Sequence, residues 1–235
     1  MIRSAYARLL VLTLVALGLL LLWDASGLDL VLARMAGTPT GFPWRDDWFL
    51  NKVMHEGAKT LSWVLVIGLF AAIRWPVGLL RRLRQGERVQ LAATALASVI
   101  LISLLKFTSK TSCPWDLQAF GGVAQYVSHW AWGVRDGGSG NCFPAGHASA
   151  AFAYLGGYFV FRRASPGVAR AWFACTLVAG LALGLSQQMR GAHFMSHTLW
   201  TAWFCWVAAF AIDALVRVLS HRRTRPNVSP KLNEA

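Results

Sequence analysis

Six apolar runs divide this chain of 235 residues, and they constrain its fold more than any other feature. Within lipid, every backbone N–H and C=O group needs a partner in its own segment, which favours a helix for each run. The runs have about 14 to 19 residues, somewhat short of the roughly 20 that a crossing needs, so flanking residues must complete each helix. We therefore predict an all-α fold: a polytopic membrane helix bundle with about six transmembrane helices, forming a single membrane domain over residues 1–235. The runs are Leu9–Trp23, Thr60–Ile73, Leu91–Leu105, Ala148–Phe161, Ala171–Leu185 and His197–Leu215.

The composition agrees with a membrane protein and argues against a soluble one. Hydrophobic residues make up 56% of the chain and charged residues only 14%, which is too apolar for a soluble domain of this size. A net charge of +13 would suggest nucleic acid as the partner of a soluble protein. Here the basic residues lie in short blocks between apolar runs, so we expect the lipid bilayer, and no nucleic acid, as the partner.

The basic blocks predict the orientation of the bundle. When alternate loops are placed on opposite sides, every basic block falls on one side, which the positive-inside rule makes cytoplasmic. Both termini are then cytoplasmic, including a basic tail over residues 216–235. The first run has the flank of a signal peptide, but no small-residue cleavage site follows it, so we expect a retained helix. Residues 24–59 are expected to form an exported loop that lies partly on the membrane surface. The blocks are Arg3 with Arg8, residues 74–88, residues 162–170 and the tail.

Three polar stretches at the ends of apolar runs fall together on the opposite face: residues 106–116, 141–147 and 190–197. Ionisable residues at membrane helix ends are costly to desolvate, which makes them candidates for function. The turn at Gly146 precedes an apolar run, where free backbone N–H groups attract anions. Two cations, three histidines and this turn make a positively charged site that can exchange protons and suits a phosphate group. The candidates are Lys106, Arg190, His147, His193 and His197.

These stretches carry a resemblance to a known family. Lys106-x6-Cys113-Pro114, then Pro144-Ala145-Gly146-His147, then Ser186 to His197 with Gly191-Ala192-His193 resemble the three motifs of the type 2 phosphatidic acid phosphatase (PAP2) superfamily, over a core of about residues 90–215. The resemblance implies that His193 is a nucleophile that forms a phosphohistidine, and that His147 is the general acid and then the base. It also implies that Lys106 and the amides of Ala145, Gly146 and His147 hold the phosphate, with no metal and no cofactor.

The chain departs from the family pattern in its phosphate-binding residues, and neighbouring residues could replace them. Arg190 lies about one helical turn from Gln187, where the family has arginine, and could reach the same phosphate. Lys110 could stand in for the arginine that is missing at Cys113. The departures are Cys113 for Arg, Ala145 for Ser, Gln187 for Arg and His197 for Asp.

The nucleophile also needs a residue that orients its ring. In the family an aspartate accepts the second ring proton of this histidine. Here His197 or Asp116 could accept that proton from His193. The other loop histidines, His55 and His129, are expected at the surface.

The four cysteines fall into two pairs. Cys113 and Cys142 lie in polar loops and could form a disulfide if those loops face an oxidising compartment, a geometry that the sequence alone leaves open. Cys175 and Cys205 lie in apolar runs, where a free thiol behaves as a small core residue.

The leading function is a lipid-phosphate phosphatase of a bacterial inner membrane, with its site on the periplasmic face and a membrane lipid phosphate as substrate. The lipid could be an isoprenyl phosphate or diphosphate, a phosphatidic acid, a phosphatidylglycerol phosphate or a lipid A phosphate. The same phosphohistidine could be discharged onto a second lipid, which would make the protein a phosphotransferase. A haem or metal protein that uses His147, His193 and His197 is a second class, which the positive charges of Lys106 and Arg190 disfavour. A non-catalytic relative that binds a phospholipid headgroup is a third, and the oligomeric state is left open.

Overall fold

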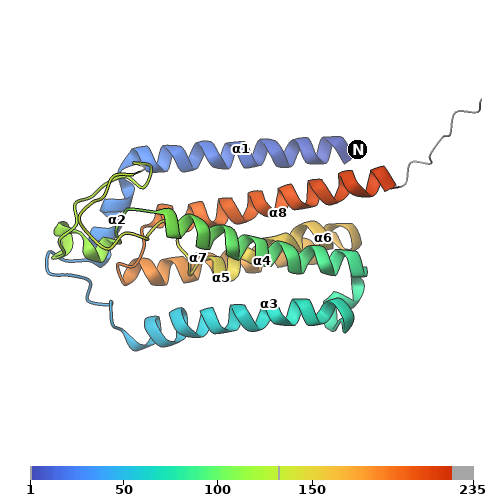
Figure 1. The fold of residues 1–235 in the computed structure, drawn as a ribbon, viewed down its shortest axis with the longest axis horizontal. Helices are drawn as coiled ribbons and strands as arrows, with labels where there is room; N and C mark the ends of the chain where they lie inside the picture. Colours follow the sequence, from blue (N-terminus) through green and yellow to red (C-terminus); the bar gives the residue numbers. More distant parts are fainter. Residues whose placement is uncertain (1, 132, 224–235) are drawn as a thin grey trace, which may run out of the picture.

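The computed structural model describes residues 2–131 and 133–223, and this part of the chain forms a bundle of long helices (Figure 1). Within it, five segments are long and apolar enough to cross a membrane. Their helices run side by side along the long axis of the molecule in Figure 1. The predicted all-helical, multi-pass membrane fold is confirmed. The long helices are α1 (Ile2–Ser26), α3 (Ala58–Arg74), α4 (Gln85–Thr108), α7 (Pro166–Met189) and α8 (Met195–Arg223).

Local chemistry explains where these helices begin and end. At the start of α4, the side chain of Glu87 accepts a hydrogen bond of 2.9 Å from the N–H of Arg84, which also places an acid in the first turn. Pro166 opens α7, where its missing N–H costs nothing. Helix α3 ends just before Trp75-Pro76, because the residue before a proline disfavours helical geometry. Each long helix extends past its apolar run at both ends, so flanking residues do complete the crossings.

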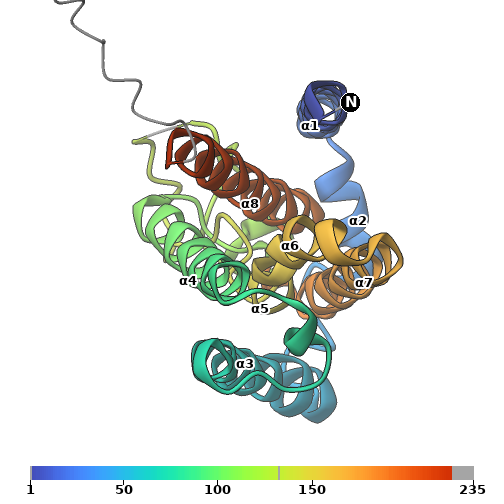
Figure 2. The same ribbon diagram turned by 90° about the vertical axis from the view of Figure 1, so that its right-hand side faces the viewer.

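The remaining apolar run, over residues 148–161, is also helical, but it lies inside the bundle. It consists of α5 (Ser149–Phe152), one tight turn over Ala153–Leu155, and α6 (Gly156–Ala164). Residues 149–164 span only about 24 Å, less than the ~30 Å of a bilayer core. Figure 2 shows α5 and α6 among α4, α7 and α8. Gly180 of α7 permits this close packing, because a Cβ atom there would lie 2.2 Å from the ring of Phe152.

Residues 24–59 contain helical elements that the sequence did not reveal. They are α2 (Leu28–Ala36) and a π-helical segment over Phe49–Gly57 that leads into α3. Asp29 of α2 is buried and accepts a hydrogen bond of 3.0 Å from the N–H of Ser196, in the first turn of α8. A carboxylate is favourable at a helix N-terminus. The expectation of a loop is therefore wrong for these two elements, and α2 anchors the start of α8.

The two ends of the bundle differ in character. Figure 1 shows α2 and the long loop over residues 109–148 gathered at one end, with the N-terminus and the last turns of α8 at the other. The three polar stretches identified in the sequence all belong to the loop end. Of the predicted basic tail, residues 216–223 continue α8, whereas residues 224–235 lie outside the described part of the chain.

Candidate active site

Lys106, His147 and His193 come together at the loop end of the bundle. Lys106 lies in the last turn of α4, His147 in the turn before α5, and His193 between α7 and α8. A Cβ atom on Gly146 would lie 3.7 Å from the Nζ atom of Lys106, so the ammonium group rests against this turn. The ring centroids of His147 and His193 are 6.2 Å apart.

The turn before α5 offers fewer free amides than expected. The N–H of Ala145 donates to the carbonyl of His197 at 3.2 Å, so it is not available to a phosphate. The N–H groups of Gly146 and His147 donate to no acceptor among residues 2–131 and 133–223. The free amides of this turn are therefore those of Gly146 and His147, beside Lys106, which is where an anion could be bound.

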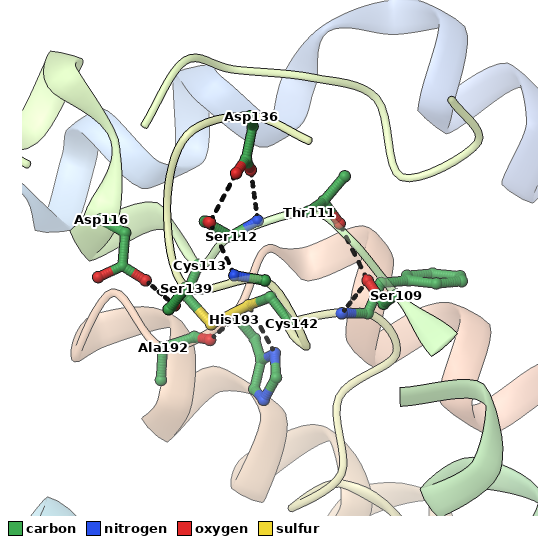
Figure 3. The surroundings of a disulfide bond; sticks show 12 residues. Ser109, Thr111, Ser112, Cys113, Asp116, Asp136, Ser139, Cys142, Ala192 and His193 are labelled. Carbon is green, nitrogen blue, oxygen red and sulfur yellow. Dashed lines mark hydrogen bonds between the residues drawn. A yellow bond between two sulfur atoms is a disulfide. The ribbon is translucent and has the colours of Figure 1, made fainter. Parts of the chain in front are cut away.

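His193 lies against a disulfide bond between Cys113 and Cys142, the pairing that the sequence left open (Figure 3). The Sγ atom of Cys142 is 3.6 Å from Nδ1 of His193 and 3.2 Å from the carbonyl oxygen of Ala192. A disulfide sulfur carries no hydrogen, so the second distance is a contact and not a hydrogen bond. The bond thus ties the loop after α4 and the loop before α5 to the backbone and ring of the predicted nucleophile.

Burial holds the pKa of His193 well below its ordinary value. The side chain is 2% exposed, and the positive charges of Lys106, His197 and His147 act in the same direction. A backbone hydrogen bond with Cys142 opposes them. The ring is therefore neutral at neutral pH, which is the form that can attack phosphorus.

Neither of the two residues predicted to orient His193 bonds to its ring. The ring of His197 lies 5.8 Å from that of His193, and its buried Nδ1 has no hydrogen-bond partner among the described residues. The carboxylate of Asp116 accepts a hydrogen bond of 2.8 Å from Ser139 instead (Figure 3). Cys142 occupies the position beside Nδ1 that these residues were expected to fill.

Arg190 lies near enough to His147 for its charge to lower the pKa of that ring. Arg190 is 6% exposed, and its Nη1 donates to Oε1 of Gln187 at 3.1 Å. Gln187, which stands where the family has arginine, therefore positions Arg190. The Nε of Arg190 donates to the carbonyl of Arg45 at 2.9 Å. Lys110 is exposed, and no described contact joins it to His147 or His193.

His55 is half-buried and contacts His147, so it is not the isolated loop histidine that was expected. Its ring packs against that of His147 in a tilted arrangement, with centroids 3.8 Å apart and an interplanar angle of 36°. Burial, and then the charges of His55, Lys106, Arg190 and Lys59, lower the pKa of His147 to about 3. No local pattern indicated this contact, because the two histidines are 92 positions apart in the sequence.

The family can now be assigned. The sequence profile of the PAP2 superfamily matches residues 88–220, which is more than half of the chain. The chain belongs to the PAP2 superfamily. Its structure is similar to the crystal structure of a transmembrane PAP2-type phosphatidylglycerolphosphate phosphatase from Bacillus subtilis. The TM-score is 0.54 at 15% identity, covering 91% of this chain and 98% of the other. No curated protein matches the sequence significantly.

A fifth histidine of this PAP2-superfamily protein, His129, packs behind the site, and its expected surface position is wrong. Its side chain is 7% exposed, and its Nε2 lies 3.4 Å from a carboxylate oxygen of Asp24. The same oxygen accepts hydrogen bonds from the indoles of Trp130 and Trp200, at 2.8 and 2.9 Å. The ring of His129 stacks on Phe143 at 4.2 Å, which links this network to the Pro144-Ala145-Gly146-His147 stretch.

The donor set does not fit a metal. Potential ligand atoms of Cys113, Cys142 and His193 lie within 4.8 Å of one another. The two sulfurs are bonded to each other, so neither is the thiolate that a metal requires.

Proposed function

We propose that this protein is an integral-membrane phosphatase that hydrolyses a phosphomonoester or diphosphate of a membrane lipid through a phosphohistidine on His193. The observation that carries the proposal is the meeting of two neutral histidines, with rings 6.2 Å apart, beside the ammonium group of Lys106. A positively charged pocket with one potential nucleophile and one potential proton carrier fits phosphoryl transfer better than any other chemistry.

The phosphate is held by charge and by backbone donors. Lys106 and the N–H groups of Gly146 and His147 bind its oxygens, and Arg190 approaches from the side of Gln187. These groups also stabilise the charge that shifts onto the phosphoryl oxygens and the leaving oxygen in the transition state.

The reaction has two steps. In the first, Nε2 of His193 attacks phosphorus while the bond from phosphorus to the lipid oxygen breaks, and His147 gives its proton to that oxygen. In the second, a water molecule attacks the phosphohistidine, His147 takes the proton from this water, and the bond from nitrogen to phosphorus breaks to release phosphate. Cys142, beside Nδ1 of His193, keeps the opposite ring nitrogen directed at the phosphate.

His147 must gain a proton when substrate binds before it can act as the general acid. With a pKa of about 3, His147 carries no proton at neutral pH in the empty site. A phosphate dianion bound beside it offsets the charges of Lys106 and Arg190, which raises this pKa and favours the protonated ring. His147 becomes a competent acid only when substrate is bound.

We propose that the site faces the periplasm, on the outer side of a bacterial inner membrane. The basic stretches over residues 74–88 and 162–170 lie at the end of the bundle opposite the loop that carries the site, and the positive-inside rule would assign that end to the cytoplasm. The phosphate of a lipid in the outer leaflet lies at the depth of the helix ends that carry the site. Candidate substrates are the isoprenyl, phosphatidyl and lipid A phosphates.

The decisive experiment measures phosphate release by the purified protein from these lipids, in excess chelator. We expect turnover of at least one lipid, and its loss in His193→Ala and His147→Ala. His221→Ala is the matched control, because it removes a histidine from the last turn of α8, at the opposite end of the bundle. No release from any lipid by the folded protein would refute the phosphatase, and transfer to a second lipid would assign a phosphotransferase instead.

The covalent intermediate can be trapped separately. A labelled aryl phosphate has a leaving group that needs no acid, so His147→Ala should still be phosphorylated by it but should hydrolyse the intermediate slowly. We expect an acid-labile, alkali-stable label on this variant and none on the His147→Ala/His193→Ala double variant. Label on the double variant would contradict the role of His193.

A further inference from the structure

A second charged cluster surrounds the buried carboxylate of Asp213 in α8 and includes the last turn of α6, which lies toward the end of the bundle that holds the N-terminus (Figure 1). Arg162 donates to this carboxylate at 3.0 Å, and Nε of Arg217 lies 3.4 Å from it. Arg163, also from α6, and Tyr6 of α1 bond to it as well. Its fifth neighbour is Gln90 of α4, which donates at 2.9 Å.

The acceptor positions of the Asp213 carboxylate are all filled, whereas the three arginines still have N–H donors to spare. A carboxylate offers about four acceptor positions, and Tyr6, Gln90, Arg162 and Arg163 fill that number. Three guanidinium groups face this single negative charge, which leaves two positive charges in excess. No other carboxylate within residues 2–131 and 133–223 pairs with these arginines. Most of their N–H groups are therefore available to a further anion.

The arginines form one wall of an open cavity of about 590 Å³, which Tyr6 and Tyr158 also line. Their side chains are 15% exposed for Arg162, 27% for Arg163 and 24% for Arg217. The guanidinium groups of Arg162 and Arg217 stack on the ring of Tyr6, at 5.0 and 4.7 Å. These contacts hold the charges in place before any ligand arrives.

A second cavity, lined mainly by apolar side chains, shares Tyr158 with the charged cavity. It has a volume of about 540 Å³ and runs between α1 and the helices α7 and α8. Tyr158 lines both cavities, and on α1 the lining passes from Tyr6 to Leu9 and on to Leu20. The stretch from Leu9 to Leu20 is about 16 Å long, close to the depth of one leaflet of a ~30 Å core.

We propose that these two cavities, which share Tyr158, together bind an anionic phospholipid, with its phosphate at Arg162, Arg163 and Arg217 and one acyl chain along α1. Guanidinium groups match phosphate oxygens in geometry as well as charge. Basic pockets between membrane helices on the cytoplasmic side are typical sites for anionic headgroups. The excess of two charges favours a lipid with two phosphates, such as cardiolipin, over a lipid with one. This lipid is a ligand and not the substrate, because the site lies at the opposite end of the bundle from His193.

The test is lipid binding to the full, delipidated protein in detergent, followed by native mass spectrometry. Cardiolipin, phosphatidylglycerol, phosphatidylcholine and inorganic phosphate alone are the four probes. We expect cardiolipin to bind at least tenfold more tightly than phosphatidylcholine, with phosphatidylglycerol between them. Equal binding of cardiolipin and phosphatidylcholine would overturn the proposal, and so would binding of inorganic phosphate as tight as that of cardiolipin.

Two matched pairs of variants locate the site. Arg217→Gln removes one charge of the pocket, whereas Arg170→Gln removes an exposed arginine from the same end, and only the first should weaken cardiolipin binding tenfold. Ala16→Trp fills the apolar cavity without touching a charge, whereas Val15 is 54% exposed and lines neither cavity, so Val15→Trp should bind normally. Equal loss within either pair would overturn the proposal. Binding should be unchanged in His193→Ala, so the result is independent of the proposed phosphatase.

Discussion

Breaking the disulfide between Cys113 and Cys142 should disable His193 without unfolding the bundle. The bond joins cysteines 29 positions apart, and Cys142 lies 3.6 Å from Nδ1 of His193. In the chain-entropy model, closing a loop of this length restricts the unfolded chain by about 12 cal/mol/K, or about 3.6 kcal/mol at 25 °C. We therefore expect the Cys113→Ala/Cys142→Ala variant to lose about 2 to 4 kcal/mol of stability.

The same variant should lose activity chiefly in kcat. Without the sulfur beside Nδ1, the ring of His193 can rotate away from the phosphate. We expect kcat to fall about tenfold, which corresponds to about 1.4 kcal/mol in the activation barrier. KM should change little, because two backbone hydrogen bonds still join the loops that carry the site. They run from Asn141 to Ser109 at 3.0 Å and from Cys142 to Thr111 at 3.1 Å.

The assay combines kcat and KM on a short-chain lipid phosphate with thermal unfolding followed by tryptophan fluorescence. Reduction of the wild-type protein should reproduce the loss, whereas Cys175→Ala, which removes an exposed free thiol, should leave both measurements unchanged. An unchanged kcat in protein that mass spectrometry shows to lack the bond would refute the role given to Cys142.

Three further predictions concern packing, protonation and the second charged cluster. In Gly184→Ala the new Cβ would lie 2.1 Å from Cγ2 of Thr198, so thermal unfolding should show a loss of about 1–3 kcal/mol; Gly68→Ala, with nothing within 4 Å, should gain about 0.5–1 kcal/mol. Binding of a phosphonate substrate analogue should take up more protons in wild type than in His147→Gln, because the pKa of His147 rises from about 3 on binding; calorimetry in buffers of different ionisation enthalpy measures this, and equal uptake would contradict it. Asp213→Asn should cost about 3–5 kcal/mol in chemical denaturation, since it leaves three arginines without their buried counter-charge, and a loss below about 1 kcal/mol would contradict that account.

Most of the fold could be predicted from the sequence, because a membrane helix is specified segment by segment. The length of each apolar run and the charge of its flanks act on that run alone. The helical elements of residues 24–59 were missed for the same reason. Helix α2 has only nine residues, and it is stabilised by partners distant in sequence, such as Ser196, which bonds to Asp29.

The sequence predicted which residues make up the candidate site, but it did not predict most of the contacts between them. The motif spacing identified Lys106, His147 and His193, which the structure brings together. It could not show that the amide of Ala145 is already bonded, or that Asp116 pairs with Ser139. Both outcomes depend on how loops pack against one another.

The sequence by itself determined a multi-pass helical membrane protein of the PAP2 superfamily, with three polar stretches at helix ends. Apolar length, flanking charge and motif spacing are local properties, and they hold whatever the neighbouring helices do. Only the tertiary structure decided that His55 packs against His147, that Cys142 lies beside His193, and that Asp213 gathers three arginines. Such contacts depend on the rotation and closeness of packed helices, which small residues such as Gly180 set through atoms far apart in the chain.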